Sequence, residues 1–487
     1  MIPVSVAQAT GLVGGRACDI PPAVEVQYLR SVATDSRLVE PGSLFVAIRG
    51  ERVDGHDYVP QALSAGALAA LVSQPVTGPS ILVQDTVASM GSLAAALRQR
   101  LAGCRVVAIT GSSGKTSTKD LLAEVLGSHG PTVAPQGSFN TEVGVPMTIF
   151  RAELGTKYLV LEMGMRGPGH ISTLVQLARP EIGVILNAGS AHLGMMGSRQ
   201  AIVEAKGEIL DLLPSEGFAV LPGDDPAILA QARRTSASIL TFGTGPSLDV
   251  RAEHVRMDEA ARPSFDMVWA ERRTEVRLQS RGRHQVANAL AAAAVCLGLG
   301  LDQDWTAAAL SAATPRSQWR MEVHRAPSGV TVVNDAYNAN PESVAAALAT
   351  LVAMGEGRRR IAVLGEMLEL GAASPALHAE VGQQAATLGI RLVCVGPGTV
   401  PMHQAAIAAG GSSHWVPDAQ EAIESVLADL GAGDTVLVKA SRGIGLEQVA
   451  LGLIEASPAA AGQVSGGSSA IGGPGAFGGS VEVRGSA

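Results

Sequence analysis

The segment GSSGKTS at residues 111–117 contains the residue types that surround phosphate groups in proteins. It directly follows the β-branched run RVVAIT (105–110) and precedes apolar residues that recur at helical spacing, so strand, loop and helix come in the order that phosphate binding requires. Gly111 and Gly114 allow a tight turn whose backbone N–H groups face phosphate oxygens, and the helix N-terminus adds a favourable dipole. This phosphate loop predicts that the chain binds a nucleoside triphosphate, which we take to be ATP.

The side chains of the phosphate loop extend this prediction to the terminal phosphate. Lys115 is expected to reach the β- and γ-phosphates, and Thr116, at the start of the helix, to offer its hydroxyl to Mg²⁺. The longer form of the motif has glycine at the position of Ile109, so this loop is the shorter TGxxGKT variant. The predicted ATP contacts of the loop are Gly111, Ser112, Ser113, Gly114, Lys115, Thr116 and Ser117.

Glu162 is the last residue of the strand-like run YLVLE (158–162). Ligands gather at the carboxyl ends of strands in open α/β sheets, and a carboxylate there suits Mg²⁺, which prefers oxygen ligands. The alternative is an acid that simply faces solvent, which is the commoner environment of a charged residue at a strand end. The neighbouring phosphate loop favours a magnesium ligand.

A parallel sheet must bring these residues together, and the pattern along the chain predicts more than one such sheet. Residues 1–103 mix short strand-like runs with Ala-rich helical stretches and are expected to form a small α/β domain. Residues 104–314 alternate strands and helices, which predicts a central mononucleotide-binding domain. Residues 315–456 repeat the alternation as a C-terminal Rossmann-like domain, and residues 457–487, rich in Gly, Ser and Ala, are expected to be disordered.

Composition and charge exclude several classes of protein. The 487 residues carry a formal net charge of -8 without clusters of Lys and Arg, which argues against a nucleic-acid-binding protein. The four cysteines are far apart and form no metal-binding spacing, as expected in a reducing compartment. No apolar run reaches the roughly 18 residues of a transmembrane helix, and the N-terminus has no signal-type pattern. We therefore expect a cytoplasmic enzyme that acts as a monomer on small molecules.

The segment TGSSGKTS, together with motifs spread from Thr34 to Gly445, resembles the Mur ligase family of peptidoglycan precursor synthesis. The run NDAYNANPES (334–343) is a long and specific motif among them. The resemblance covers nearly the whole chain except the tail. It implies an ATP-dependent ligase whose three domains bind a uridine nucleotide, ATP and an amine substrate. Within the family it points to a ligase that joins D-alanyl-D-alanine to UDP-N-acetylmuramoyl-tripeptide through an acyl phosphate, releasing ADP and phosphate.

The resemblance also implies a catalytic centre that contains magnesium ions. Glu162 matches a magnesium ligand, and His192 matches a histidine at a second metal. Lys206 matches a position at which several members carry a carbamylated lysine, which turns a cation into an anionic oxygen ligand; the alternative is an ordinary surface lysine on an amphipathic helix. The expected catalytic residues are Lys115, Glu162, His192, Lys206 and Arg320, and the expected metal ligands are Thr116, Glu162, His192 and Lys206.

Further residues match family positions near ATP. Asn140 belongs to a loop beside the γ-phosphate, in which Thr141 replaces a second asparagine. Asn288 matches a residue that faces the adenine. Arg320 matches an arginine that reaches the γ-phosphate from the third domain, where it stabilises charge once the domains close, and Asp335 matches an acid near the ribose.

The substrate sites implied by the resemblance lie in the outer domains. The run TDSRLVEPGSLFVAIRGERVDGHDYV (34–59) resembles a uridine-diphosphate-binding segment, although Asp and Ser also favour simple turns. The run KASRGIGLE (439–447) resembles a loop near the amine substrate. The candidate substrate contacts are Asp35, Ser36, Arg37, Tyr337, Asn338, Ser441 and Arg442.

Other functions fit parts of the sequence. One alternative is a sister ligase that adds an amino acid to a shorter UDP-linked peptide, which normally shows a D-N-P-R segment that is absent here. A folate polyglutamylating ligase shares the TGxxGKT loop. The alternative from a different class is a switch that hydrolyses ATP without ligation, and such a protein needs neither a uridine-binding domain nor a third sheet.

Overall fold

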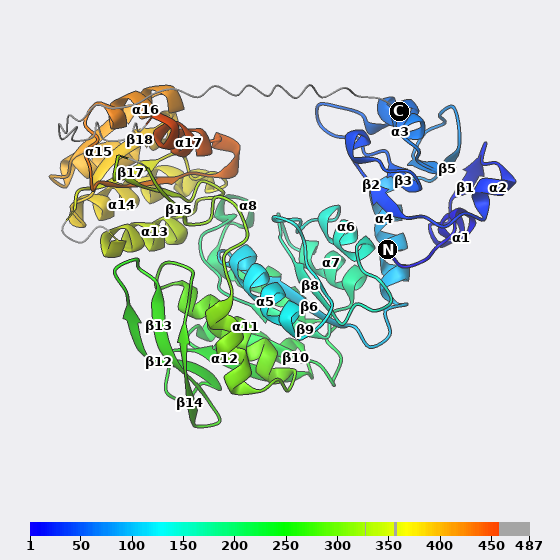
Figure 1. Ribbon diagram of the computed structural model, residues 1–487, viewed down its shortest axis with the longest axis horizontal. Coiled ribbons are helices and arrows are strands. Elements are labelled where there is room, and N and C mark those ends of the chain that lie inside the picture. Colours follow the sequence, from blue (N-terminus) through cyan, green and yellow to red (C-terminus); the bar gives the residue numbers. More distant parts are fainter. Residues whose placement is uncertain (327, 355–357, 457–487) are drawn as a thin grey trace, which may run out of the picture.

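The computed structural model describes residues 1–326, 328–354 and 358–456, and the tail expected to be disordered at 457–487 lies outside these residues. Three β-sheets follow one another along the chain, and Figure 1 shows them as three bodies, with the central one (cyan to green) joining the other two. The three-domain α/β class expected from the sequence is confirmed. Among the described residues, no helix is both long and apolar enough to cross a membrane.

The N-terminal sheet has the strand order β1-β5-β4-β3-β2, and only β1 runs antiparallel to its neighbour. Strands β3 and β4 are buried along their whole length because their largely apolar side chains are covered on both faces. The elements are α1 (Val6–Leu12), β1 (Arg16–Cys18), α2 (Pro22–Glu25), β2 (Ser31–Ala33), β3 (Ser43–Val46), α3 (Val59–Ser64), β4 (Ala69–Val72), β5 (Ser80–Leu82) and α4 (Thr86–Arg98).

The central sheet has nine strands in the order β14-β13-β12-β11-β10-β9-β6-β8-β7. Neighbouring strands are parallel from β7 to β12, and β12, β13 and β14 continue as an antiparallel meander. Helices α5 and α11 pack against each other over one face of this sheet. The elements are β6 (Arg105–Thr110), α5 (Lys115–His129), β7 (Thr132–Val133), α6 (Gly144–Phe150), β8 (Tyr158–Glu162), α7 (His170–Ala178), β9 (Ile182–Ile185), α8 (Leu193–Met196), α9 (Arg199–Gly207), β10 (Phe218–Pro222), α10 (Pro226–Leu229), β11 (Ser238–Gly243), β12 (Val250–Met257), β13 (Pro263–Trp269), β14 (Arg272–Arg277), α11 (Gln285–Gly298) and α12 (Gln303–Ala312).

The C-terminal sheet has the order β15-β16-β20-β17-β18-β19, with β15 as an antiparallel edge strand. The last strand, β20, lies between β16 and β17, so the strand order changes direction there and leaves a crevice at the carboxyl ends of these strands. The elements are β15 (Glu322–Arg325), β16 (Thr331–Asn334), α13 (Pro341–Met354), β17 (Arg360–Leu364), α14 (Ser374–Thr387), β18 (Arg391–Val395), α15 (Val400–Ala408), β19 (Ser413–Val416), α16 (Ala419–Leu427), β20 (Thr435–Lys439) and α17 (Glu447–Ala456).

Arg98 connects the end of α4 to the central domain through hydrogen bonds. Helix α4 packs against α6 and α7, and the buried guanidinium of Arg98 donates to the carbonyl oxygens of Ala178 (3.1 Å) and Arg179 (3.3 Å). It also lies 3.1 Å from a carboxylate oxygen of Glu181. Because these partners lie at the end of α7 and just after it, the junction between the first two domains is a packed and hydrogen-bonded contact.

Replacing Arg98 by Ala is expected to destabilise the chain by about 2 kcal/mol, because hydrogen bonds of charged groups contribute about 1.5–3 kcal/mol and two carbonyl groups lose their donor. The measurement is the melting temperature of the purified protein by calorimetry. Arg100→Ala is the matched control, since Arg100 is exposed and makes one hydrogen bond, to the Pro3 carbonyl. Equal melting temperatures for the two variants would show that Arg98 does not hold the junction.

Candidate active site

The phosphate loop turns from β6 into α5 as the sequence predicts. Gly114 has a φ of 79°, a left-handed conformation that favours glycine, and a Cβ at this position would clash with the side-chain oxygen of Asn288. The ammonium group of Lys115 donates to the Gly111 carbonyl at 2.7 Å, so it lies folded over the loop. Burial lowers the pKa of Lys115, and the nearby carboxylate of Glu162 opposes that shift.

Asn187, which follows β9, braces the phosphate loop from the side. Its Oδ1 accepts hydrogen bonds from the backbone N–H groups of Ser112 (2.9 Å) and Ser113 (3.0 Å), and its Nδ2 donates to the Ser113 carbonyl (3.1 Å). The side chain therefore bonds to both N–H and carbonyl groups of the loop backbone. These three hydrogen bonds hold the curvature of the loop.

Glu162 is the centre of a cluster of oxygen atoms next to the loop. Its side chain is buried with 1% of the residue surface exposed, and it accepts hydrogen bonds from the Thr116 hydroxyl (3.0 Å) and the Asn140 amide (2.8 Å). The Thr116 hydroxyl also lies 2.9 Å from that of Ser138. A buried carboxylate that is satisfied only by neutral donors, beside two hydroxyls, fits a hard cation such as Mg²⁺.

The described residues contain no group of three or more His, Cys, Asp or Glu side chains arranged to hold a metal ion. This composition agrees with magnesium sites in nucleotide-binding enzymes, which use one or two carboxylates and rely on phosphate oxygens and water for the other ligands. Thr116 and Glu162 are the two predicted metal ligands that the structure brings together.

Lys206, on α9, is buried with 1% of its surface exposed. The alternative of an ordinary surface lysine is therefore wrong. Burial lowers the pKa of Lys206 well below its usual value, and the positive charge of Lys115 lowers it further. Because an uncharged amine is the form that reacts with CO₂, this environment suits carbamylation.

His192 lies at the junction of the central and C-terminal domains. It precedes α8 with a φ of 66°, and its Nδ1 is 2.6 Å from a carboxylate oxygen of Glu369, in the loop after β17. The Glu369 carbonyl accepts a hydrogen bond from the Gly194 N–H at 3.1 Å. His192 thus faces the other domain and is not part of the Glu162 cluster.

Arg320 reaches the phosphate loop from the segment before β15. Its Nη2 donates to the Thr116 hydroxyl at 3.1 Å, and its guanidinium stacks 4.3 Å from the ring centre of Tyr337. This contact joins the second and third domains at the residue expected to hold Mg²⁺. It is the arrangement that stabilisation of a transferring phosphoryl group requires.

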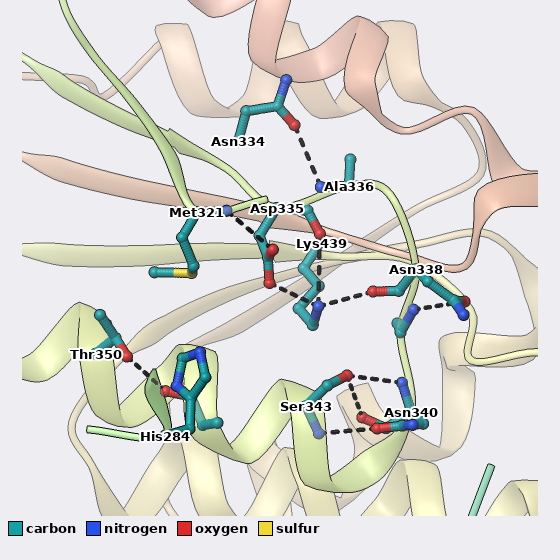
Figure 2. A network of polar contacts seen from close by, with 12 residues as sticks. His284, Met321, Asn334, Asp335, Ala336, Asn338, Asn340, Ser343, Thr350 and Lys439 are labelled. Carbon is teal, nitrogen blue, oxygen red and sulfur yellow. Dashed lines mark hydrogen bonds and ion pairs between the residues drawn. The ribbon is translucent and has the colours of Figure 1, made fainter. Parts of the chain in front are cut away.

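Asp335, at the carboxyl end of β16, is buried and paired with Lys439, at the end of β20 (Figure 2). The two charged groups are 2.6 Å apart, and the other oxygen of Asp335 accepts the Met321 N–H at 3.0 Å. Lys439 also donates to the Asn338 carbonyl at 2.7 Å. Burial lowers the pKa of Lys439, and Asp335 opposes this effect.

A cavity of about 650 Å³ lies between the phosphate loop and the C-terminal domain. This volume falls in the range of small-molecule sites. Eight of the predicted ATP and substrate contacts line it, namely Ser112, Ser113, Gly114, Ser117, Asn288, Arg320, Asp335 and Asn338. Gln285 also lines the cavity, and its side-chain oxygen accepts a hydrogen bond from Asn288 at 2.9 Å.

The N-terminus of α13 docks on the central domain at this cavity. The Glu342 carboxylate accepts hydrogen bonds from the Ser190 N–H (2.7 Å) and hydroxyl (2.9 Å). Asn340 donates to the Ser112 carbonyl at 3.3 Å and accepts the Ser343 N–H, so its side chain joins the helix start to the phosphate loop. These hydrogen bonds join the C-terminal domain to the phosphate loop and to the segment after β9.

Replacing Glu342 by Ala is expected to raise the KM for ATP about tenfold. The variant loses two hydrogen bonds of a charged acceptor, each contributing about 1.5–3 kcal/mol. Only part of this free energy favours the closed arrangement of the domains, so the effect on KM is smaller than the sum. Steady-state kinetics with varied ATP measures this. Glu124→Ala is the matched control, because the Glu124–Arg316 pair is a surface ion pair of the kind that contributes about 0–1 kcal/mol. An unchanged KM in both variants would contradict the role of Glu342.

The candidate substrate residues are engaged locally. Asp35 pairs with Arg37 at 2.6 Å, which lowers the pKa of Asp35 to about 2, and Ser36 donates to Gln61 at 3.0 Å. In the C-terminal domain, the Ser441 hydroxyl accepts the Leu368 N–H (2.9 Å) and donates to the Ala339 carbonyl (3.2 Å). Arg442 stacks on Trp319 and pairs with Glu447. These contacts stabilise loops, and the first three residues lie on a different domain from the cavity.

Several site residues were not predicted from the sequence, namely Ser138, Asn340, Glu342, Glu369 and Lys439. Lys439 carries the clearest signal, since it is a charge at the carboxyl end of an apolar strand. Asn340 and Glu342 fall within the motif NDAYNANPES. Glu369 follows no pattern that marks a site.

Three family models match the chain along most of its length. They are the "Mur ligase family, catalytic domain" over residues 29–106, the "Mur ligase middle domain" over 109–296, and the "Mur ligase, glutamate ligase domain" over 319–442. The three matched regions follow the three sheets in chain order, although β1 lies before the first region and β6 falls at the boundary between the first two.

Curated proteins and solved structures give the same family. The UDP-N-acetylmuramoyl-tripeptide--D-alanyl-D-alanine ligase of Mycobacterium tuberculosis is 43% identical over 500 residues, covering 93% of this chain and 98% of that protein, and the Escherichia coli enzyme of the same name is 36% identical, covering 93% and 99%. A crystal structure of MurF from Acinetobacter baumannii has a TM-score of 0.84 at 29% identity and covers 93% of this chain and 99% of that one. The MurF ligase of Thermotoga maritima in complex with ADP has a TM-score of 0.76 at 30% identity, covering 88% and 98%.

Proposed function

Because the chain belongs to the Mur ligase family, we propose that its three domains act together as an ATP-dependent ligase that joins D-alanyl-D-alanine to UDP-N-acetylmuramoyl-tripeptide. The observation that carries this proposal is the junction of the phosphate loop with the third domain, where Arg320 donates to Thr116. A relative solved with ADP supports the use of ATP.

The reaction has two steps. A carboxylate oxygen of the tripeptide attacks the γ-phosphorus of ATP, ADP leaves, and an acyl phosphate forms. The amine of D-alanyl-D-alanine then attacks the acyl carbon, and phosphate leaves with the bridging oxygen, giving the UDP-linked pentapeptide. Activation is needed because a free carboxylate is a poor acylating agent.

The charges of the phosphate loop and of Arg320 serve the first step. Lys115 folds over the phosphate loop and Arg320 donates to Thr116, so both cations are near the loop and neutralise the charge that spreads over the transferring group. Domain closure also excludes water from the acyl phosphate and brings the amine close to the acyl carbon. The hydrogen bonds of Glu342 and Asn340 support such a closed state.

We propose Mg²⁺ as a cofactor, with one ion held by Thr116 and Glu162 and a second ion held by His192 and a carbamylated Lys206. When bound, the metal supplies positive charge that neutralises phosphate oxygens. The buried oxygen cluster around Glu162 and the buried amine of Lys206 support this assignment.

The remaining contacts are proposals of the same kind. Asn140 acts beside the γ-phosphate through its bond to Glu162, Asn288 faces the adenine, and Asp335 lies near the ribose. The candidate residues of the outer domains bind the two acceptors: Asp35, Ser36 and Arg37 bind the uridine diphosphate, and Tyr337, Asn338, Ser441 and Arg442 bind the dipeptide.

We further propose domain boundaries near residues 103 and 315, with these Gly- and Pro-containing junctions as hinges. A monomeric state and a cytoplasmic location complete the proposal, because the reaction uses small charged molecules and ATP.

Phosphate release by the purified protein tests the function. With ATP and Mg²⁺ present, release is expected only when UDP-N-acetylmuramoyl-tripeptide and D-alanyl-D-alanine are both added. Release with a shorter UDP-linked peptide and a single amino acid would favour a sister ligase. Continuous release without either acceptor would favour an ATP-hydrolysing switch.

A further inference from the structure

The segment that carries Arg320 has an unusual backbone. Trp319 and Met321, on either side of Arg320, have φ angles of 57° and 52°, in the left-handed region that bulky side chains rarely adopt. Such a conformation persists only when surrounding contacts hold it, and it is commonly found where a functional side chain must be aimed. The contacts that hold these two residues therefore decide where Arg320 points.

Two carboxylates hold this strained turn by its backbone. Glu322 accepts the Trp319 N–H at 3.1 Å, and Asp335 accepts the Met321 N–H at 3.0 Å. Glu322 lies on the turn's own strand, and its other oxygen pairs with His324, so it gives local support. Asp335, at the carboxyl end of β16, ties the turn to the rest of the domain, together with the Tyr337 N–H, which donates to the Trp319 carbonyl at 3.3 Å, and Arg442, which stacks on Trp319.

Lys439 in turn holds Asp335, as Figure 2 shows. The ammonium group donates to Oδ2 of Asp335 (2.6 Å), to the Asn338 carbonyl (2.7 Å) and, more weakly, to the Asp335 carbonyl (3.5 Å). These three acceptors match the three protons of an ammonium group. Lys439 lines the cavity, but it is only 3% exposed and its ammonium protons are engaged by these acceptors.

We propose that Lys439 is a positioning residue of this enzyme, which holds Asp335 and thereby the strained Trp319–Met321 turn, so that Arg320 points at the phosphate loop. Three contacts carry the effect: Lys439 with Asp335, Asp335 with the Met321 N–H, and Arg320, the neighbour of Met321 in the chain, with Thr116. Tyr337, whose ring supports the Arg320 guanidinium, lies on the same loop between Asp335 and Asn338. The inference rests on the proposed role of Arg320 in phosphoryl transfer.

The test compares Lys439→Met with Arg359→Met in the full chain. Arg359 pairs with the buried Asp434, which lies just before β20. Lys439 is the last residue of β20 and also pairs with a buried aspartate. Both variants therefore remove the partner of a buried carboxylate in the same domain. We expect K439M to lower kcat at least about 100-fold at saturating substrates, and R359M to stay within about threefold of the unchanged protein. Affinity for the UDP-linked tripeptide is expected to be unchanged in both.

A double variant separates positioning from a structural role. If Lys439 acts through Arg320, then the kcat of R320M/K439M equals that of R320M within about threefold. The arginine that Lys439 positions is already absent from R320M, so the loss of Lys439 has no further effect on kcat. Multiplied losses in the double variant, or a kcat of K439M close to that of R359M, would overturn the inference. Should K439M fail to fold, as judged by circular dichroism, Lys439→Gln replaces it with the same expectations and the same deciding outcomes. Absence of ligation by the unchanged protein would instead count against the proposed function.

Discussion

Replacing Lys115 by Ala is expected to lower kcat about 10³-fold, to the limit of detection. The ammonium group of Lys115 folds over the phosphate loop and is the cation nearest to where the β- and γ-phosphates are expected. Removing one such electrostatic contact to a transition state typically costs a factor of about 10²–10³, and the loop offers no second lysine to replace it. Steady-state phosphate release in the presence of both acceptors gives the measurement.

The same variant is expected to bind UDP-N-acetylmuramoyl-tripeptide as tightly as the unchanged protein, because the proposed uridine site lies on another domain. Isothermal titration calorimetry measures this affinity. Lys157→Ala is the matched control, since Lys157 is an exposed lysine of the same domain whose ammonium group contacts His129. Equal loss of turnover and of UDP-peptide affinity in K115A would contradict the assignment of the two sites to different domains.

Replacing Lys206 by Ala is expected to lower kcat about 100-fold, because removal of a residue that holds a metal site costs about 10–100-fold and a buried cavity is left as well. The lowered pKa of the buried amine favours its uncharged form, which is the form that reacts with CO₂. A carbamate signal is expected in the carbon-13 spectrum of the unchanged protein supplied with labelled bicarbonate, and none in K206A. Protein stripped of CO₂ is expected to regain activity when bicarbonate is added.

Lys119→Met is the control for burial alone. Lys119 is a second buried lysine of the central domain, and it donates to the Pro135 carbonyl. We expect K119M to lose stability while keeping kcat within about threefold. A carbamate signal that persists in K206A, or a K206A variant as active as K119M, would show that Lys206 carries no carbamate that matters for catalysis.

Much of the fold could be predicted because apolar runs mark buried parallel strands. RVVAIT and YLVLE are β6 and β8 with the same bounds. The meander β12–β14 was not predicted, since its strands face water on one side and carry charges there, as in VRAEHVRM of β12. A charge-rich run of this kind gives no continuous apolar signal.

The candidate site could be predicted where one segment contains the chemistry. The phosphate loop is such a segment, and Glu162, Asn140 and Arg320 meet around its Thr116. The contacts that position these residues come from segments far apart in the chain, such as Lys439 with Asp335. Their pairing depends on which strands become neighbours in the sheet, and in this fold the last strand is inserted beside the second.

Burial separated the alternatives that the sequence left open. A lysine on an amphipathic helix reads as a surface residue, yet Lys206 points into the domain. Asp335 was expected only as a contact to the ribose, and the structure gives it a second task at the Met321 backbone. In both cases the side chain's surroundings, and not its type or spacing, decide what it does.

The central claim is that a γ-phosphoryl group held by the phosphate loop is passed to the carboxylate of the tripeptide. Synthesis with oxygen-18 in that terminal carboxylate, followed by mass spectrometry of the released phosphate, tests it most directly. The acyl phosphate route predicts one oxygen-18 atom in the phosphate from each fully labelled carboxylate, because the bridging oxygen leaves with phosphorus. Release of unlabelled phosphate together with the labelled pentapeptide would contradict the account.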